Sequence, residues 1–170
     1  MEQTNSEAVF DPDFADQNAH HLSHQEAKER DAAIKQVSLY KLCLNLHKET
    51  RYEGNVEIKM LLKQCSLESQ DIFLDFHGEK VVSLKVNGEK AAIKFSQHKL
   101  YLPKENMKVD EEITISIRFE NTYVTNSAGL HRFQDPEDQN IYFYTHLEPY
   151  FCNRWFPCFD QPSIRAPLAL

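Results

Sequence analysis

Apolar and polar residues alternate with a period of two through most of the chain from Gln36 onward. In VSLYKLCLNLHKE, alternate positions form two faces, and one face is much the more apolar. Similar runs are VEIKMLL, DIFLDF, KVVSLKV, AAIKF, KLYLP, EEITISIRFENTY and IYFYTHLE. About seven to nine strands of this spacing, with no alternation of strands and helices, are typical of antiparallel sandwiches. We therefore predict an all-β fold, a saddle-shaped antiparallel β-sandwich with a short leading helix.

Turn residues separate these runs. Asn87-Gly88 predicts a hairpin with a type I′ turn, since both central residues of such a turn need positive φ. Further turns are predicted at residues 53–55 (Glu-Gly-Asn) and at His77-Gly78. The stretch TNSAGLHRFQDPEDQN lacks alternation and contains Gly129, Asp135-Pro136 and Asn140, so it is predicted to be a long ordered loop.

The N-terminal part divides into a tail and a helix. Residues 1–21 are polar, acidic and aperiodic, which predicts an unpacked tail, and residues 22–170 are predicted to form one domain. In LSHQEAKERDAAI, Ser23 can cap a helix while Glu26, three residues on, completes a capping box. A short helix over residues 23–34 follows from this pattern.

Composition narrows the function classes. The chain has 41% hydrophobic and 26% charged residues with 4 Gly and 7 Pro, which excludes collagen-like and wholly disordered proteins. A net charge of -7 makes nucleic acid and anionic membranes poor partners. The acidic start resembles neither a signal peptide nor a membrane span, so a cytoplasmic location is expected. The cysteines Cys43, Cys65, Cys152 and Cys158 match no zinc or redox spacing and are expected to be free, mostly buried thiols.

No complete catalytic motif is present. The sequence has no HExxH, GxSxG, P-loop or dinucleotide fingerprint, so this chain alone is predicted to be inactive. His20, His21 and His24 could together bind a metal ion. No carboxylate or thiol is placed nearby as a further ligand, which favours a solvated histidine cluster.

Four residues near the C-terminus invite a functional interpretation. His146 and Glu148 are two apart on IYFYTHLEP, which predicts that both face the same side of a strand. A carboxylate at a strand end can bind a peptide α-amino group, although a solvated glutamate is the simpler interpretation. Arg154 and Asp160 are predicted to pair and lock an aromatic loop onto the sandwich.

Two segments resemble a known family. The run NSAGLHRFQDPEDQNIYFYTHLEPYFCNRWFPCFDQPSIRAPL, residues 126–168, closely resembles the end of the N-terminal domain in the aminopeptidase N family of zinc metallopeptidases, in its GLHRF-type branch. The segment LSHQEAKERDAAIKQVSLYKLCLNL resembles that branch's entry helix and first strand. The resemblance implies a concave β-domain that packs on a thermolysin-like catalytic domain and closes one side of the peptide cleft.

The resemblance also implies roles for two residues. Glu148 matches the family glutamate that helps hold the substrate α-amino group, and His146 stands where the family usually has the glutamine of the first side-chain subsite. It further implies zinc in the parent enzyme, with the peptide N-terminus and the catalytic domain as partners. The apolar end PLAL predicts an unpaired sheet edge, so we expect a fragment that lacks the last strands of its domain.

Two functions therefore stay open. The first is a substrate-cleft-forming domain of a zinc aminopeptidase that removes N-terminal amino acids from peptides. The alternative is a non-catalytic β-sandwich module for protein interaction.

Overall fold

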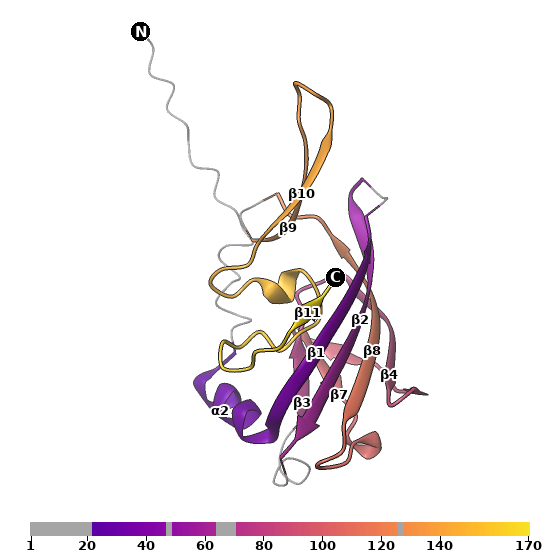
Figure 1. Ribbon diagram of the computed structural model, residues 1–170, viewed down its shortest axis with the longest axis vertical. Helices are drawn as coiled ribbons and strands as arrows, with labels where there is room; N and C mark the ends of the chain where they lie inside the picture. Colours follow the sequence, from indigo (N-terminus) through magenta and orange to yellow (C-terminus); the bar gives the residue numbers. More distant parts are fainter. Residues whose placement is uncertain (1–21, 47–48, 64–70, 126–127) are drawn as a thin grey trace.

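The computed structural model describes residues 22–46, 49–63, 71–125 and 128–170 (Figure 1). The predicted tail, with His20 and His21, lies outside these ranges, as does Cys65. The described residues form one α-helix, two short 3-10 helices and three sheets. None of these helices is long and apolar enough to cross a membrane.

The largest sheet has six strands in the order β11-β1-β2-β8-β4-β5. Its strands are β1 (Ile34–Asn45), β2 (Arg51–Leu62), β4 (Lys80–Val86), β5 (Glu89–Lys90), β8 (Ile113–Thr122) and β11 (Leu168–Ala169). All neighbours are antiparallel except β11, which runs parallel to β1 with Leu168 opposite Tyr40. The apolar residues Leu168 and Ala169 form the outermost strand of this sheet, which pairs on one side with β1.

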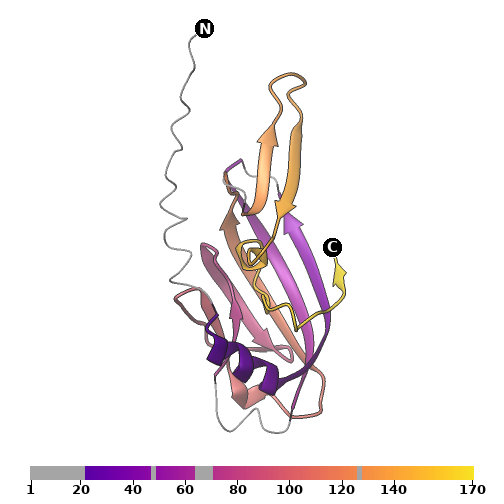
Figure 2. The same cartoon turned by 90° about the vertical axis from the view of Figure 1, so that its left-hand side faces the viewer.

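A smaller sheet covers one face of these long strands, as Figure 2 shows. It contains β3 (Ile72–Asp75), β7 (Lys99–Leu102) and β6 (Lys94–Ser96). The side chains between the two sheets form one hydrophobic core, in which Ile113, Ile115, Ile117 and Phe119 of β8 lie on one buried face as their alternation predicts. The β-sandwich prediction is confirmed.

Helix α2 (His24–Ala33) begins as predicted. The Ser23 hydroxyl accepts the Glu26 backbone N–H, and the Glu26 carboxylate accepts the Ser23 N–H, which completes the capping box. The helix carries Arg30, whose guanidinium forms a buried two-point ion pair with Asp75 of β3, at 2.6 and 2.9 Å. This pair fastens the helix to the small sheet.

The predicted turn at residues 53–55 is wrong. Gly54 lies inside β2, and the connection between β1 and β2 falls between Asn45 and Arg51. A Cβ atom at Gly54 would lie only 2.2 Å from Cζ of Phe119. The glycine thus makes room for an aromatic ring of the neighbouring strand rather than forming a turn. The predicted hairpin at Asn87-Gly88 is confirmed, with φ of 52° and 86°.

The predicted long loop at residues 125–140 is also wrong. Its centre forms β9 (Gly129–Gln134), which pairs with β10 (Ile141–His146) in a separate two-stranded sheet. The remaining elements are the 3-10 helices η2 (Lys104–Asn106) and η3 (Cys152–Arg154). The described residues form eleven strands rather than seven to nine, because several strands have only two or three residues.

Candidate functional site

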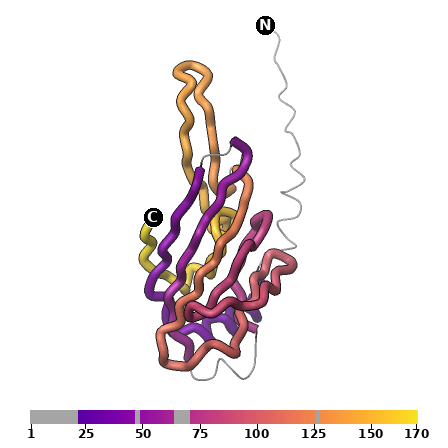
Figure 3. The backbone as a smooth tube through the Cα atoms, turned by 90° about the vertical axis from the view of Figure 1, so that its right-hand side faces the viewer, coloured from indigo at the N-terminus to yellow at the C-terminus, as the bar shows by residue number. Residues whose placement is uncertain are grey.

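The β9–β10 hairpin extends away from the body of the sandwich (Figures 1 and 3). Its six antiparallel pairs run from Ile141 opposite Gln134 to His146 opposite Gly129. Every residue of β10 is exposed, and the hairpin presents five large apolar side chains that are 38–53% exposed, namely Phe133, Ile141, Tyr142, Phe143 and Tyr144. The register places Phe133, Tyr142 and Tyr144 on one face of the hairpin and Ile141 and Phe143 on the other. Exposed apolar side chains gathered in this way indicate a contact surface.

The hairpin tip is held by its own polar groups. Asp138 accepts hydrogen bonds from the Asn140 backbone N–H at 2.8 Å and from the Tyr142 hydroxyl at 2.7 Å. These bonds, the backbone one first, lower the pKa of the Asp138 carboxyl. The tip is therefore a defined turn.

The hairpin base is buried, unlike its tip. Gly129 has a φ of 120°, and a Cβ atom there would approach Cβ of Arg154 to 3.2 Å. His131 is only 6% exposed and stacks on its cross-strand partner Tyr144, with ring centres 4.7 Å apart and planes 2° apart. Burial, and then the neighbouring His146, lower the pKa of His131, which favours its neutral imidazole.

His146 and Glu148 lie at the C-terminal end of this hairpin. Strand β10 ends at His146, and Glu148 stands in the following turn, where the Glu148–Pro149 peptide bond is cis. Strand alternation therefore does not extend to Glu148, contrary to the basis of the prediction that the two side chains share one strand face. Both residues are exposed.

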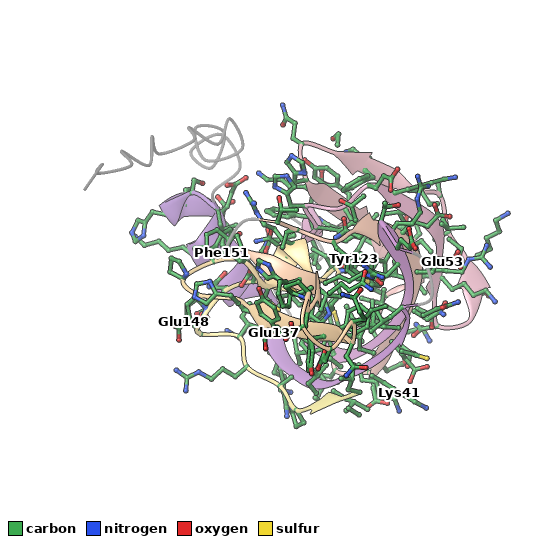
Figure 4. The ribbon with its side chains drawn as sticks, turned by 90° about the horizontal axis from the view of Figure 1, so that it is seen from above. Lys41, Glu53, Tyr123, Glu137, Glu148 and Phe151 are labelled. Carbon is green, nitrogen blue, oxygen red and sulfur yellow. The ribbon has the colours of Figure 1, made fainter. Side chains whose placement is uncertain are left out.

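The Glu148 carboxylate is available for a ligand. Figure 4, which looks down on the hairpin, shows Glu148 at the periphery of the molecule, on the same side as Phe151. No described residue pairs with this carboxylate through a hydrogen bond or an ion pair. An exposed carboxylate of this kind can accept charge-assisted hydrogen bonds from an ammonium group.

The segment after Glu148 is firmly tied to the sandwich. The Phe151 N–H donates to the Leu147 carbonyl at 3.0 Å, which closes the turn. Beyond it, the Tyr52 hydroxyl donates to the Trp155 carbonyl at 2.6 Å, and the Asn121 side-chain amide donates to the Arg154 carbonyl at 2.8 Å. The turn that carries Glu148 thus lies between the exposed hairpin and a fixed segment.

Arg154 and Asp160 do not pair as predicted. One carboxylate oxygen of Asp160 accepts the backbone N–H of Asn153 at 2.9 Å and its side-chain amide at 2.7 Å. The guanidinium of Arg154 lies over the Phe151 ring instead, 5.3 Å from its centre. Asn153 is therefore the residue that locks this loop, while burial raises the pKa of Asp160.

Sequence reasoning missed two parts of this region. The first is Asn153, whose carbonyl also accepts the His77 N–H at 2.9 Å. The second is the Arg30–Asp75 pair, in which Asp75 also accepts the Asp160 N–H at 3.0 Å. Such contacts join residues far apart in sequence, so no local pattern indicates them. His131 lies in the short run GLHRF, which forms a strand although its apolar and polar residues do not alternate.

The described residues hold no group of three His, Cys, Asp or Glu side chains that could bind a metal ion. The described part of the chain therefore does not fit a zinc site. Glu148 and His146, the two residues predicted to bind substrate, both lie exposed at the end of the aromatic hairpin.

Comparison with known proteins places this chain among the peptidases. The Peptidase M1 N-terminal domain family matches residues 36–170. The probable aminopeptidase 1 of Sulfurisphaera tokodaii is 29% identical over 134 residues, which cover 79% of this chain and 16% of that protein. Aminopeptidase N of Streptomyces lividans is 27% identical over 150 residues, covering 85% of this chain and 17% of that protein. The chain spans about a sixth of the length of these curated relatives.

Solved structures show the same fold. Yeast LTA4 hydrolase superposes with a TM-score of 0.67 at 19% identity, covering 78% of this chain and 22% of that one. An M1 zinc metallopeptidase from Deinococcus radiodurans, a mutant bound to a Tyr-Ser-Ala substrate, has a TM-score of 0.61 at 20% identity, covering 78% and 31% of the two chains. The family match extends over most of the sandwich, the hairpin and the Glu148 turn, and this chain belongs to the Peptidase M1 N-terminal domain family.

Proposed function

We propose that this chain is the substrate-cleft-forming domain of a zinc-dependent aminopeptidase, which removes N-terminal amino acids from peptides. The family match and the aminopeptidase names of the relatives support this function. The domain contributes one wall of the cleft, and the catalytic domain of the parent enzyme is its partner. Zinc in that enzyme would activate water for attack on the peptide bond, and its ligands belong to the catalytic domain.

The observation that carries the proposal is the Glu148 carboxylate. It is exposed and without a partner among the described residues, on a turn whose following segment is fixed to the core. A peptide α-amino group is a cation with several N–H donors, so it complements this carboxylate. In our proposal Glu148 binds that amino group and thereby selects the end of the peptide, which positions the first peptide bond for cleavage.

His146 is proposed to line the first side-chain subsite. A neutral imidazole offers one donor and one acceptor, much as the amide of the family glutamine does. A protonated imidazole offers two donors and a positive charge beside the substrate amine, which would repel it. The side-chain preference of the enzyme should therefore change where His146 becomes charged.

The test is a Glu148→Gln variant of the full-length enzyme that contains this domain. The variant keeps the size of the side chain but loses its charge, so we expect kcat/KM for peptides with a free α-amino group to fall about 10- to 100-fold. Glu137→Gln is the matched control, since Glu137 is an exposed carboxylate at the hairpin tip. Equal kinetics of the two variants would contradict the role of Glu148.

A second candidate function rests on the exposed hairpin. Its five apolar side chains suit a non-catalytic module that binds another protein through this surface. This function requires that the isolated 170-residue chain fold cooperatively and stay soluble. Thermal unfolding and sedimentation of the purified chain test this requirement, because aggregation of the native chain would contradict it.

A further inference from the structure

An open groove of about 390 Å³ lies between β1 and the segment that follows the hairpin. It is mostly apolar, with Tyr40, Trp155 and Phe156 among its lining residues. Two cysteines, Cys152 and Cys158, also line it. Cys152 is partly exposed, whereas Cys158 is only 3% exposed.

The two cysteines are six residues apart and line the same groove. Burial, and then the neighbouring Cys152 thiol, raise the pKa of the Cys158 thiol. Backbone structure holds both residues in place. Cys152 begins the 3-10 helix η3, and Cys158 exchanges two backbone hydrogen bonds with Asp75, at 2.8 and 3.1 Å. Neither thiol is in a disulfide in this structure.

We propose that Cys152 and Cys158 form an oxidation site that closes to a disulfide when a peroxide enters the groove. A partly exposed thiol is accessible to a small oxidant, and a second thiol on the same groove can reach the oxidised sulfur. Cys152 is the attacking thiol because it is the more exposed of the two. Cys158 is the resolving thiol, since burial slows its direct reaction with peroxide. This inference does not depend on the proposed peptidase function.

The chemistry balances with hydrogen peroxide as the oxidant. The Cys152 thiolate attacks one peroxide oxygen, the O–O bond breaks, and hydroxide leaves, which yields a sulfenic acid. Cys158 then attacks the Cys152 sulfur, the S–S bond forms, and the sulfenic oxygen departs as hydroxide. The two protons released by the thiols convert both hydroxides to water. Two thiols are thus oxidised by two electrons while the peroxide is reduced by two.

Cys43 provides the contrast within the same chain. It is exposed on β1, so peroxide can reach it, but no other described cysteine lines the hollow in which it lies. A sulfenic acid on Cys43 therefore lacks the neighbouring thiol that Cys152 has. The difference between a paired and a single thiol is what the experiment measures.

The experiment uses the full 170-residue chain with Cys43 and Cys65 both replaced by serine. The chain is treated with hydrogen peroxide under native conditions, remaining thiols are blocked, and the protein is digested with trypsin. Arg154 lies between the two cysteines, so cleavage after it leaves Cys152 and Cys158 on separate peptides that only a disulfide joins. Trp155, the only tryptophan, lines the same groove, so its fluorescence should change on oxidation and recover with dithiothreitol.

We expect the joined peptides as the main product, with both thiols recovered by dithiothreitol. In Cys158→Ser, Cys152 should stop at the sulfenic acid and react with dimedone. In Cys152→Ser, Cys158 should stay reduced at the same peroxide concentration. The proposal fails if the two peptides remain separate after native treatment, if they join only in urea, or if Cys158 is oxidised equally fast in the absence of Cys152.

Discussion

The six-stranded sheet and the β9–β10 hairpin are both rich in aromatic residues but expose them to different extents. On β8, Phe119 is fully buried and makes edge contacts with the rings of Phe76 and Tyr52, at 5.3 and 6.3 Å. On β10, Phe143 and Tyr144 remain 38% and 53% exposed. Because burial of apolar area stabilises the fold, the buried rings of the sheet contribute to stability. The exposed rings of the hairpin are instead suited to contacts outside the described chain.

The largest expected effect tests this division directly. Phe119→Ala should lower the free energy of unfolding by about 4 kcal/mol, because it leaves a cavity between the sheets and above Gly54. Phe143→Ala is the matched change on the hairpin and should cost less than about 1 kcal/mol, since its ring is partly in water already and packs mainly on Tyr123. Urea unfolding of both variants measures the difference. Equal losses would mean that the hairpin belongs to the core.

The second effect concerns the buried ion pair that joins helix α2 to strand β3. Arg30→Met should lower stability by about 3 kcal/mol, because it leaves the buried Asp75 carboxylate with only the N–H of Asp160. Lys35→Met removes the exposed Lys35–Asp110 pair, which has a similar length of 2.7 Å, and should cost at most about 1 kcal/mol. A loss for Arg30→Met as small as that for Lys35→Met would show that the buried pair is unimportant for stability.

The third effect is a pH dependence of stability that arises at the buried base of the hairpin and not at its exposed tip. Because burial lowers the pKa of His131 below its usual value of 6.5, the unfolded chain binds more protons between the two pKa values. This contribution to stability is complete above pH 6.5 and is lost as pH falls toward the folded pKa. His131→Phe keeps a ring against Tyr144 but cannot be protonated.

The measurement is the melting temperature of both proteins as the pH is lowered from about 7 to about 5. All other ionisable groups are common to both proteins, so the difference between the two curves isolates His131. We expect the parent protein to lose more stability than His131→Phe over this range. Parallel curves would contradict a buried, neutral His131.

Features that depend on neighbours along the chain could be predicted from sequence, whereas features that depend on distant residues could not. Local patterns predicted the alternating face of β8, the Asn87-Gly88 hairpin and the Ser23 cap correctly, since each depends on neighbours along the chain. Gly54 was misread because its reason for being glycine is the ring of Phe119 on another strand. Strand β9 was missed because turn-forming residues at 129, 135–136 and 140 surround a run of only six residues.

The candidate site divides in a similar way. The run IYFYTHLEP predicted that His146 and Glu148 lie together at the end of a strand. The turn after His146 and the cis Glu148–Pro149 bond had no indicator in the sequence beyond Pro149 itself. The expected Arg154–Asp160 pair failed because charge alone does not decide partners. Asn153 can offer both a backbone N–H and a side-chain amide to Asp160, and these two donors satisfy the carboxylate instead.

The smallest expected effect lies at the exposed tip. Tyr142→Phe removes the hydroxyl that donates to Asp138 and leaves the Asn140 backbone N–H in place. We therefore expect the pKa of Asp138 to rise only part of the way toward its usual value, with no detectable change in melting temperature. Carboxyl NMR titration of Asp138 measures the first change. Tyr144→Phe is the control, since the Tyr144 hydroxyl forms no hydrogen bond with Asp138 in the described structure. A clear loss of thermal stability in Tyr142→Phe would mean that the polar contacts of the tip stabilise the fold. The difference in stabilising role between hairpin and sheet would then hold only for their apolar side chains.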